Sequence, residues 1–295
     1  MHVAVLGAGT MGHGIAQVSA MAGHDVTLRD VDEDVVGEGV DAIDENLRGG
    51  VERGKVTPEE REAALARITG TTDLAEAVSE ADLVVEAVPE DVELKRDVLG
   101  EAEDAAPADA VLASNTSSLP VTEIAAALDA PERFVGLHFF NPVHIMALVE
   151  VVVAEQTSDE TLDFAAEFVD GIEKTPVEVA DSPGFASSRL GVSLGVEAMR
   201  MLQEGVASPR DVDQAMELGY NHPMGPVELG DVVGLDVRLD ILEHLRDELG
   251  ERFRPPQILK RKVRAGKLGK KTGEGFYVWE DGERVGVSGD WGDDA

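Results

Sequence analysis

The chain has 295 residues, 43% of them hydrophobic, which is enough for two domains that each bury a core. It carries 59 acidic residues against 25 lysines and arginines, and its formal net charge of −34 makes nucleic acid and anionic membranes unfavourable partners. The absence of cysteine excludes disulfides, thiolate catalysis and cysteine-based metal sites, and we expect a cytoplasmic protein.

The acidic residues are spread over many segments, such as residues 30–38, 41–45 and 76–82. Excess acid over the whole surface is typical of halophilic proteins, because high salt screens the repulsion between the charges. An acidic protein that works at ordinary salt is the alternative. The size and spread of the charge favour the halophilic interpretation.

A glycine-rich turn follows the first apolar run of the chain, residues 2–6. The turn consists of Gly7, Ala8, Gly9, Thr10, Met11 and Gly12. In a dinucleotide-binding turn the first glycine permits the bend, the second lets the backbone approach a pyrophosphate, and the third lets the helix pack on the strand. Free N–H groups at the start of that helix bind phosphate. A strand, this spacing and a helix in succession favour nucleotide binding over a structural glycine turn.

The next predicted strand, residues 25–30, ends in an acidic residue, Asp30. A carboxylate at this place accepts hydrogen bonds from the adenosine ribose and repels a 2′-phosphate, which favours NAD over NADP. Arg29 beside it opposes this preference. The first strand begins at residue 2, so we expect no signal or transit peptide, and no apolar run is long enough to span a bilayer.

Strand-like and helix-like segments alternate through the first part of the chain. Further strands are predicted at residues 83–88, 111–114, 134–139 and 148–153, with helices at residues 58–68, 92–103 and 121–128. This alternation is typical of an α/β fold with a doubly wound, Rossmann-type sheet. We place this domain at residues 1–183.

His138 and Glu150 lie in two of these predicted strands, each in strongly apolar surroundings. A lone ionised carboxylate on a buried strand face is unfavourable unless a partner pairs with it, and His138 is the nearest candidate. A histidine oriented by a carboxylate is an effective general base near neutral pH. The alternative is a glutamate that protects a strand edge together with a structural core histidine.

The chain becomes helical after residue 183. Residues 191–204, 209–218 and 234–249 have helical spacing, and Pro226 suits the first turn of a further helix. We expect an all-helical C-terminal domain at residues 184–279, followed by a frayed acidic tail at residues 280–295. The seven histidines lack an HExxH motif or comparable spacing, so no metal site is predicted.

Several separate motifs of the chain occur in the same order in one enzyme family. They are residues 7–12, 113–119, 136–142, 183–185, 221–231 and 270–277. On these motifs the chain, from residue 2 to residue 277, resembles the short-chain 3-hydroxyacyl-CoA dehydrogenases, which include the 3-hydroxybutyryl-CoA dehydrogenases. The resemblance implies an oxidoreductase of fatty acid metabolism, as in β-oxidation, that uses NAD and acts reversibly on the C3 hydroxyl of a 3-hydroxyacyl-CoA.

The resemblance also assigns roles to single residues. His138 matches the catalytic base and Glu150 the carboxylate that orients it. Ser117 matches the hydroxyl that binds the reacting oxygen of the substrate, and Asn115 lies between nicotinamide and substrate. From residue type alone, Asn115 and Ser117 are also consistent with strand-end and helix-cap positions. Further cofactor contacts are implied for Asp30, Glu90, Lys95 and Lys271, and further substrate contacts for Asn46, Arg53, Asn141 and Ser188.

Ser188 departs from the family pattern, because relatives usually carry Asn at this position of the motif that begins at Pro183. A serine hydroxyl is shorter than a carboxamide, so we expect altered substrate affinity with catalysis retained. For the assembly, the resemblance implies a homodimer formed through the helical domain.

Two other functions are consistent with the sequence. One is a related dehydrogenase that acts on a 3-hydroxy acid without coenzyme A, which a requirement for the thioester would exclude. The other is a non-catalytic relative, because a lens crystallin shares the family pattern. The presence of His138, Glu150 and Ser117 argues against a non-catalytic protein.

Overall fold

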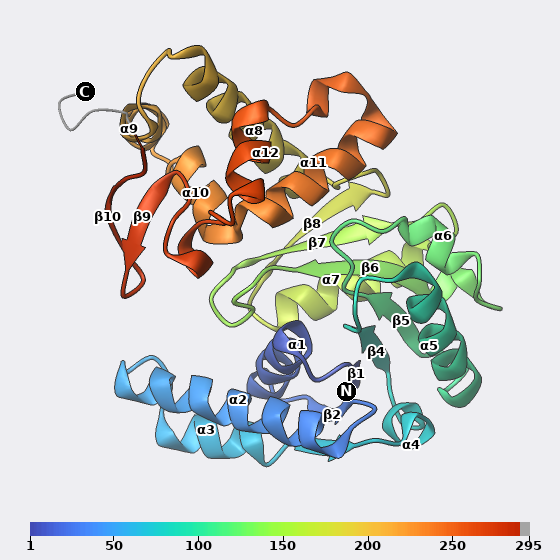
Figure 1. Ribbon diagram of the computed structural model, residues 1–295. Coiled ribbons are helices and arrows are strands. Elements are labelled where there is room, and N and C mark those ends of the chain that lie inside the picture. The colour runs from blue at the N-terminus through green and yellow to red at the C-terminus, as the bar shows by residue number, and fades with distance from the viewer. Residues whose placement is uncertain (290–295) are drawn as a thin grey trace. The chain divides into compact units, whose positions relative to one another are not determined.

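The computed structural model describes residues 1–289 of the chain (Figure 1). The chain divides into two compact units, Met1–Phe185 and Ala186–Ala295. The domain boundary that we placed after residue 183 lies close to this division. Each unit contains hydrophobic core of its own.

The first unit is built around one eight-stranded sheet, with the strands in the order β3-β2-β1-β4-β5-β6-β7-β8. Strands β1 to β6 are mutually parallel, β7 runs antiparallel to β6, and β8 is parallel to β7. The doubly wound sheet predicted from the alternation is therefore present. The strands are β1 His2–Leu6, β2 Asp25–Arg29, β3 Ile68–Thr71, β4 Leu83–Glu86, β5 Val111–Ser114, β6 Phe134–Phe139, β7 Leu148–Val153 and β8 Thr175–Ala180.

Strands β3 and β8 have no counterpart among the predicted strands. β3 contains Gly70 and β8 contains Pro176, and both residue types disfavour strands. Both strands lie at edges of the sheet, where such residues are tolerated because one side of the strand carries no ladder hydrogen bonds. Their sequences therefore resemble loops although they pair as strands.

Helices form hydrophobic cores against both faces of the sheet, because neighbouring strand residues point to opposite faces. In β1, Val3 and Val5 join one core, to which α1, α2, α3 and α7 contribute, while Ala4 and Leu6 join a second core with α4, α5 and α6. The helices are α1 Thr10–Met21, α2 Glu33–Glu52, α3 Pro58–Leu65, α4 Leu74–Val78, α5 Val92–Ala105, α6 Val121–Ala125 and α7 Asp159–Gly171, with the 3₁₀ helix η1 Pro131–Arg133.

The second unit is mainly helical, as expected. Its core includes Val196, Leu242 and Phe276. Two buried aspartates tie its helices to the end of the chain: Asp231 accepts hydrogen bonds from the backbone N–H of Phe276 and Tyr277, and Asp213 accepts one from the Tyr277 hydroxyl. The elements are α8 Ser187–Glu204, α9 Pro209–Tyr220, α10 Pro226–Val233, α11 Leu235–Leu249, η2 Glu251–Phe253, α12 Gln257–Arg264, η3 Lys270–Thr272, β9 Tyr277–Glu280 and β10 Glu283–Val287.

The prediction of a frayed tail from residue 280 onward is wrong for its first part. Strands β9 and β10 pair as an antiparallel hairpin. Asp281 and Gly282 have φ values of 50° and 82°, as a two-residue hairpin turn requires, and an Asp-Gly pair is a strong signal for such a turn. The remainder of the predicted tail, residues 290–295, lies outside the described residues.

No helix within residues 1–289 combines the length and the apolar character needed to cross a membrane.

Candidate active site

His138 and Glu150 face each other across the antiparallel pair formed by β6 and β7. The two residues are register partners, and Nδ1 of His138 lies 2.8 Å from Oε2 of Glu150. Both side chains are buried. Since an ionised carboxylate can only accept, the Nδ1–H donates, and the basic lone pair of the imidazole is then on Nε2. The contact expected from the sequence is present, and the geometry is that of an oriented general base.

Two phenylalanine rings lie against the imidazole of His138. The ring centroid of Phe140 is 4.3 Å away and that of Phe185 is 5.7 Å away, both tilted relative to the imidazole. Phe185 has a φ of 48°, an uncommon backbone conformation for a residue with a large side chain. The glutamate and the two aromatic rings together restrict the orientation of the imidazole.

Asn115 and Ser117 lie in the loop that follows β5, at the carboxyl end of the sheet. Oδ1 of Asn115 accepts a hydrogen bond of 2.9 Å from the backbone N–H of Phe139, the residue after His138. This bond leaves the NH₂ group of Asn115 as its donor to a ligand. Ser117 is exposed, and its hydroxyl lies 3.3 Å from Oε1 of Glu90. The structure therefore joins the Asn115 loop to the strand of His138.

The glycine-rich turn between β1 and α1 fits a dinucleotide. Gly7 has a φ of 108°, and a Cβ there would lie 2.6 Å from the carbonyl oxygen of Ala87. A Cβ on Gly12 would lie 1.7 Å from the carbonyl oxygen of Gly7, whereas a Cβ on Gly9 would meet nothing within 4 Å. Gly9 thus has the open surroundings that a pyrophosphate requires, while Gly7 and Gly12 permit close packing.

Helix α1 also differs from its neighbours in how it begins. Side chains of Asp32, Thr57, Asp91 and Ser158 accept hydrogen bonds from N–H groups in the first turns of α2, α3, α5 and α7. The N-cap of α1 is Gly9, which has no side chain to do so, and the first turn, which contains Thr10 and Met11, holds no acidic residue. The first N–H groups of α1 are therefore left for a phosphate.

Asp30 follows β2 and contacts the glycine-rich turn. Its Oδ2 accepts a hydrogen bond of 2.8 Å from the backbone N–H of Ala8, and its Oδ1 accepts one from Val31. The guanidinium of Arg29 donates to the carbonyl oxygen of Thr72. This hydrogen bond occupies the guanidinium of Arg29, whose positive charge would otherwise weaken the preference for NAD.

Lys95 and Glu90, both predicted to contact the cofactor, lie beside β4. The ammonium of Lys95 is fully buried, 2.8 Å from Oε1 of Glu86 and 3.3 Å from Oε2 of Glu90, and it donates to the carbonyl oxygen of Val88 at 3.2 Å. Three acceptors thus surround its three hydrogens. A direct contact between Lys95 and a dinucleotide would require one of these interactions to break.

Glu86 did not figure in the sequence analysis, although it contacts both Lys95 and the loop of Asn115. It is fully buried at the end of β4, and its Oε2 accepts a hydrogen bond of 2.5 Å from the Ser114 hydroxyl. A signal was present in the sequence. An acidic residue that closes the apolar run of residues 83–86 needs a partner when the strand is buried.

The remaining predicted site residues are distributed over both units. In the first unit, Asn46 is half-buried on α2, Arg53 is exposed at the end of α2, and Asn141 is exposed after β6. In the second unit, Ser188 is half-buried in the first turn of α8. Lys271 lies in η3 and forms an ion pair of 2.7 Å with Asp236.

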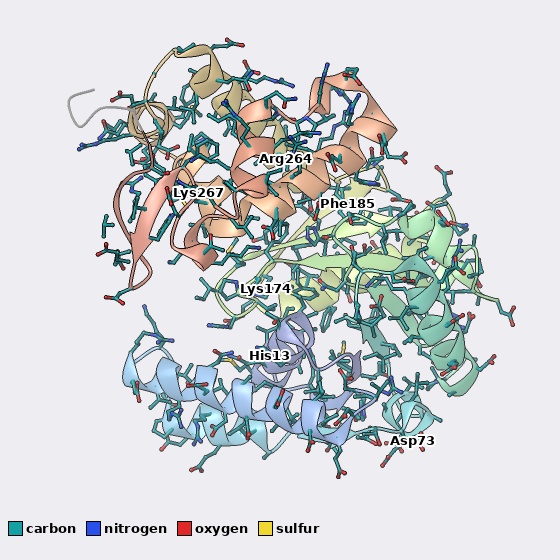
Figure 2. All side chains as sticks on the ribbon, in the orientation of Figure 1. His13, Asp73, Lys174, Phe185, Arg264 and Lys267 are labelled. Atoms are coloured by element: carbon teal, nitrogen blue, oxygen red, sulfur yellow. The ribbon has the colours of Figure 1, made fainter. Side chains whose placement is uncertain are left out.

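A cavity of about 690 Å³ lies in the first unit, and cationic side chains gather around it. Lys55, Arg67, His144 and Lys174 line it together with two glutamates and several apolar residues. Burial lowers the pKa of His144, and the positive charges of Arg53 and Lys174 and the nearby His13 lower it further (Figure 2 labels Lys174 and His13). In a chain of net charge −34, three lysine and arginine side chains against two glutamates give this cavity a local excess of positive charge.

Within residues 1–289, no group of three or more His, Asp and Glu side chains is arranged to hold a metal ion.

Family models match both units of the chain. The model described as 3-hydroxyacyl-CoA dehydrogenase, NAD binding domain, matches residues 2–182, and the model of the C-terminal domain matches residues 184–279. The chain belongs to the 3-hydroxyacyl-CoA dehydrogenase family.

Relatives and solved structures agree with this assignment. A probable 3-hydroxybutyryl-CoA dehydrogenase of Deinococcus radiodurans is 44% identical over 280 residues, which cover 95% of this chain and 100% of the relative. A mitochondrial hydroxyacyl-coenzyme A dehydrogenase of Sus scrofa is 43% identical over 286 residues, 95% of this chain and 91% of the relative. The crystal structure of (S)-3-hydroxybutyryl-CoA dehydrogenase from Ralstonia eutropha matches with a TM-score of 0.91 at 40% identity, covering 95% and 99% of the two chains.

The family match confirms the predicted fold class, the predicted cofactor NAD and the predicted enzyme class. The protein is an oxidoreductase, an NAD-dependent 3-hydroxyacyl-CoA dehydrogenase. The family match does not assign roles to single residues, which stay predictions.

Proposed function

We propose that His138 is the general base of this dehydrogenase and that Glu150 orients it. The observation that carries the proposal is the buried contact of 2.8 Å between the two side chains, beside the loop of Asn115. Nε2 of His138 takes the proton from the C3 hydroxyl of the substrate, and Glu150 stabilises the imidazolium that forms. Bound NAD supplies the hydride acceptor.

Ser117 holds the reacting oxygen in this proposal, and Asn115 uses its free NH₂ group between the nicotinamide and the substrate. The hydroxyl of Ser117, 3.3 Å from Oε1 of Glu90, turns its single proton toward the reacting oxygen of the substrate when substrate binds, while the substrate hydroxyl gives its own proton to His138. In the reverse reaction His138 returns the proton to the ketone oxygen, because the same groups act in both directions.

The anionic part of coenzyme A binds, in our proposal, to the cationic region around the cavity. Arg53 is predicted to contact coenzyme A. Its positive charge, like that of Lys174, lowers the pKa of His144, which lines the cavity. Phosphate groups are attracted to clustered cations, and a phosphate-rich ligand needs such a place on an acidic chain. Asn46 lies on the same helix as Arg53 and is a further candidate contact.

We also propose that the protein is a cytoplasmic homodimer that works in β-oxidation. Four apolar side chains of α10 and α11 support a dimer through the second unit, since each is at least 37% exposed: Leu229, Val232, Val233 and Val237. Contiguous exposed apolar residues are typical of interaction surfaces. Size-exclusion chromatography with light scattering would measure the mass, and a monomer at micromolar concentration would contradict this part of the proposal.

The test of the catalytic proposal is His138→Gln. With acetoacetyl-CoA as substrate and NADH absorbance as the signal, we expect kcat to fall by about 10² to 10⁴, the usual contribution of a positioned general base, while NADH binding is unchanged. The wild-type enzyme should require the thioester and leave free acetoacetate unreduced.

His24→Gln is the matched control. His24 packs on Phe168 and lies just before β2, at the opposite edge of the sheet from the carboxyl ends of the parallel strands. This variant should keep the wild-type kcat. A His138→Gln enzyme that also keeps it would disprove the assignment of the base.

A further inference from the structure

Lys95 bridges two carboxylates at the carboxyl end of β4. Its ammonium lies 2.8 Å from Glu86 and 3.3 Å from Glu90. Lys95 and Glu86 are fully buried, whereas the Glu90 side chain is partly exposed. The cluster therefore runs from the interior of the first unit toward its surface.

The two carboxylates hold opposite ends of one short loop, residues 114–118. At the first end, the Ser114 hydroxyl donates to Oε2 of Glu86 at 2.5 Å. At the other end, Oε1 of Glu90 accepts from the Thr116 hydroxyl at 2.6 Å and from the backbone N–H of Ser117 and Ser118 at 2.9 and 3.2 Å. Asn115 lies between these attachments and Ser117 is itself one of them, so the position of the loop depends on both glutamates.

The charges of the cluster have two different environments. Burial raises the pKa of Glu86, although Lys95 and the hydrogen bonds from Ser114 and Val88 oppose it. Burial also raises the pKa of Glu90, but Lys95 and the hydrogen bonds from the loop outweigh it, and the net pKa lies below the ordinary value. Glu90 is thus held as the carboxylate, the form that accepts the N–H bonds of the loop.

Stability alone does not explain this arrangement. A buried ion pair is often no more stabilising than apolar side chains of the same size, because both charges lose their hydration. A fixed charge with defined hydrogen bonds can, however, set the position of its neighbours. The geometry accordingly points to a role in placing the loop.

We propose that Glu86 and Lys95 are positioning residues of the active site. Lys95 holds Glu90, and Glu90 fixes the loop that presents Ser117 and Asn115, while Glu86 anchors both Lys95 and the start of the loop. The proposal rests on the role given above to Ser117.

The decisive variant removes both buried charges together, Glu86→Gln with Lys95→Met. Because Glu86 and Lys95 are removed together, neither is left behind as a fully buried unpaired charge. Glu90, whose side chain is 36% exposed, keeps its hydrogen bonds to the loop, so we expect the variant to fold with some loss of stability. Glu90 loses Lys95, so the loop should loosen and kcat/KM for acetoacetyl-CoA should fall about tenfold to a hundredfold, as for a small displacement of a catalytic group. The dissociation constant for NADH should change less than this.

A second readout does not depend on activity. The backbone N–H groups of Ser117 and Ser118 are bonded to Glu90, so their hydrogen exchange should be faster in the double variant than in the wild type. Glu103→Gln is the control. Glu103 likewise joins a cation, Arg133, to two backbone N–H groups, those of Asp129 and Ala130, and it should alter neither the exchange of the loop nor kcat/KM.

Ser114→Ala tests the same idea should the double variant fail to fold. It removes one hydroxyl and no charge, and we expect kcat/KM to fall about tenfold, the worth of one hydrogen bond to a charged group, with faster exchange at residues 115–118. Wild-type exchange in the loop together with wild-type kcat/KM would overturn the proposal. A wild-type enzyme without activity on acetoacetyl-CoA would instead contradict the proposed function, and faster loop exchange in the variant would still support the positioning of the loop.

Discussion

At the scale of single residues, Asp30 links the glycine-rich turn to the choice of cofactor. The carboxylate that accepts the N–H of Ala8 is also the one predicted to bind the adenosine ribose. We propose that this one side chain both shapes the turn and repels a 2′-phosphate. A change at Asp30 should therefore affect both the affinity for NADH and the discrimination against NADPH.

Asp30→Ser tests this double role. We expect the ratio of kcat/KM with NADH to kcat/KM with NADPH to fall about tenfold, since a charged acceptor is replaced by a neutral one. Asp25→Ser is the control, because Asp25 lies at the other end of β2 and pairs with Arg67 on the surface. Equal efficiency with both cofactors in the unmodified enzyme would remove the role given to Asp30.

Ser188→Asn restores the residue that relatives carry in this motif. A carboxamide reaches further than a hydroxyl and adds a donor, so KM or the chain-length preference should shift by about 1 kcal/mol, with a smaller effect on kcat. Kinetics with 3-ketoacyl-CoA substrates of increasing chain length would measure the shift. Ser193→Asn, on another side of α8, serves as the control. Identical kinetics of Ser188→Asn and wild type would show that position 188 does not contact the substrate.

The sequence analysis could identify His138 and Glu150 because each is a polar residue in an apolar strand, so that a partner was required. It could not identify the partners of Lys95. A lysine on a helix with charged neighbours looks solvated, and only the packing of α5 against β4 shows that its ammonium is buried. Glu86 was missed for a different reason: the signal was present in the sequence, but the acid stands at the last position of its strand and was not weighed as a buried residue. Isolated polar residues in strands were informative, whereas a contact between a helix and a strand depends on the tertiary fold.

At the scale of elements, the connection between β6 and β7 is held by a buried lysine. Nζ of Lys174, located just before β8, donates to the carbonyl oxygens of Val143 and Met146 at 2.6 and 2.7 Å. The side chain of Val143 packs closely on Gly14 of α1, where a Cβ would lie only 2.8 Å away. Lys174 therefore helps to fix the loop after His138 against the helix of the dinucleotide turn.

Lys174→Met should destabilise the first unit by about 1–3 kcal/mol at neutral pH, because two buried carbonyl groups lose their donor. Burial lowers the pKa of Lys174, so at alkaline pH the unfolded chain retains a proton that the folded chain has released. The unfolding free energy of the wild type therefore rises with pH in this range, whereas that of the Met variant lacks this contribution. The decrease in unfolding free energy caused by the substitution should be larger near about pH 10 than at pH 7.

Urea denaturation of both proteins at the two pH values measures this difference. Lys55→Met, at an exposed position on the same cavity, is the control and should change the unfolding free energy little at either pH. A loss that is the same at both pH values would show that the lysine is not held in a desolvated position.

Helices and strands with a regular pattern of apolar residues were predicted from the sequence, and those with an irregular pattern were missed. Central strands such as β1 and β5 were found with their correct bounds, because continuous apolar runs mark strands buried on both faces. The edge strands β3 and β8 were missed because each contains a residue type that disfavours strands, glycine in β3 and proline in β8. The hairpin of β9 and β10 carried a turn signal, Asp281 followed by Gly282, that acidic composition obscured.

At the scale of the whole molecule, the charge of −34 sets the response to salt. Repulsion between surface carboxylates extends over a Debye length of about 30 Å at 0.01 M salt and about 3 Å at 1 M. We therefore expect the melting temperature to rise between dilute buffer and molar KCl. The same melting temperature in both salt solutions would contradict the halophilic interpretation.

The buried bridge from Glu86 through Lys95 has a consequence for an enzyme with such a surface. Dissolved ions weaken interactions between exposed charges but hardly reach a pair that no solvent touches. The anchoring of the Ser117 loop through Glu86 and Lys95 is therefore insulated from the medium, while the stability of the protein as a whole is not. Over a range of brine concentrations, the fraction of folded molecules would vary, yet each folded molecule would present the same catalytic geometry.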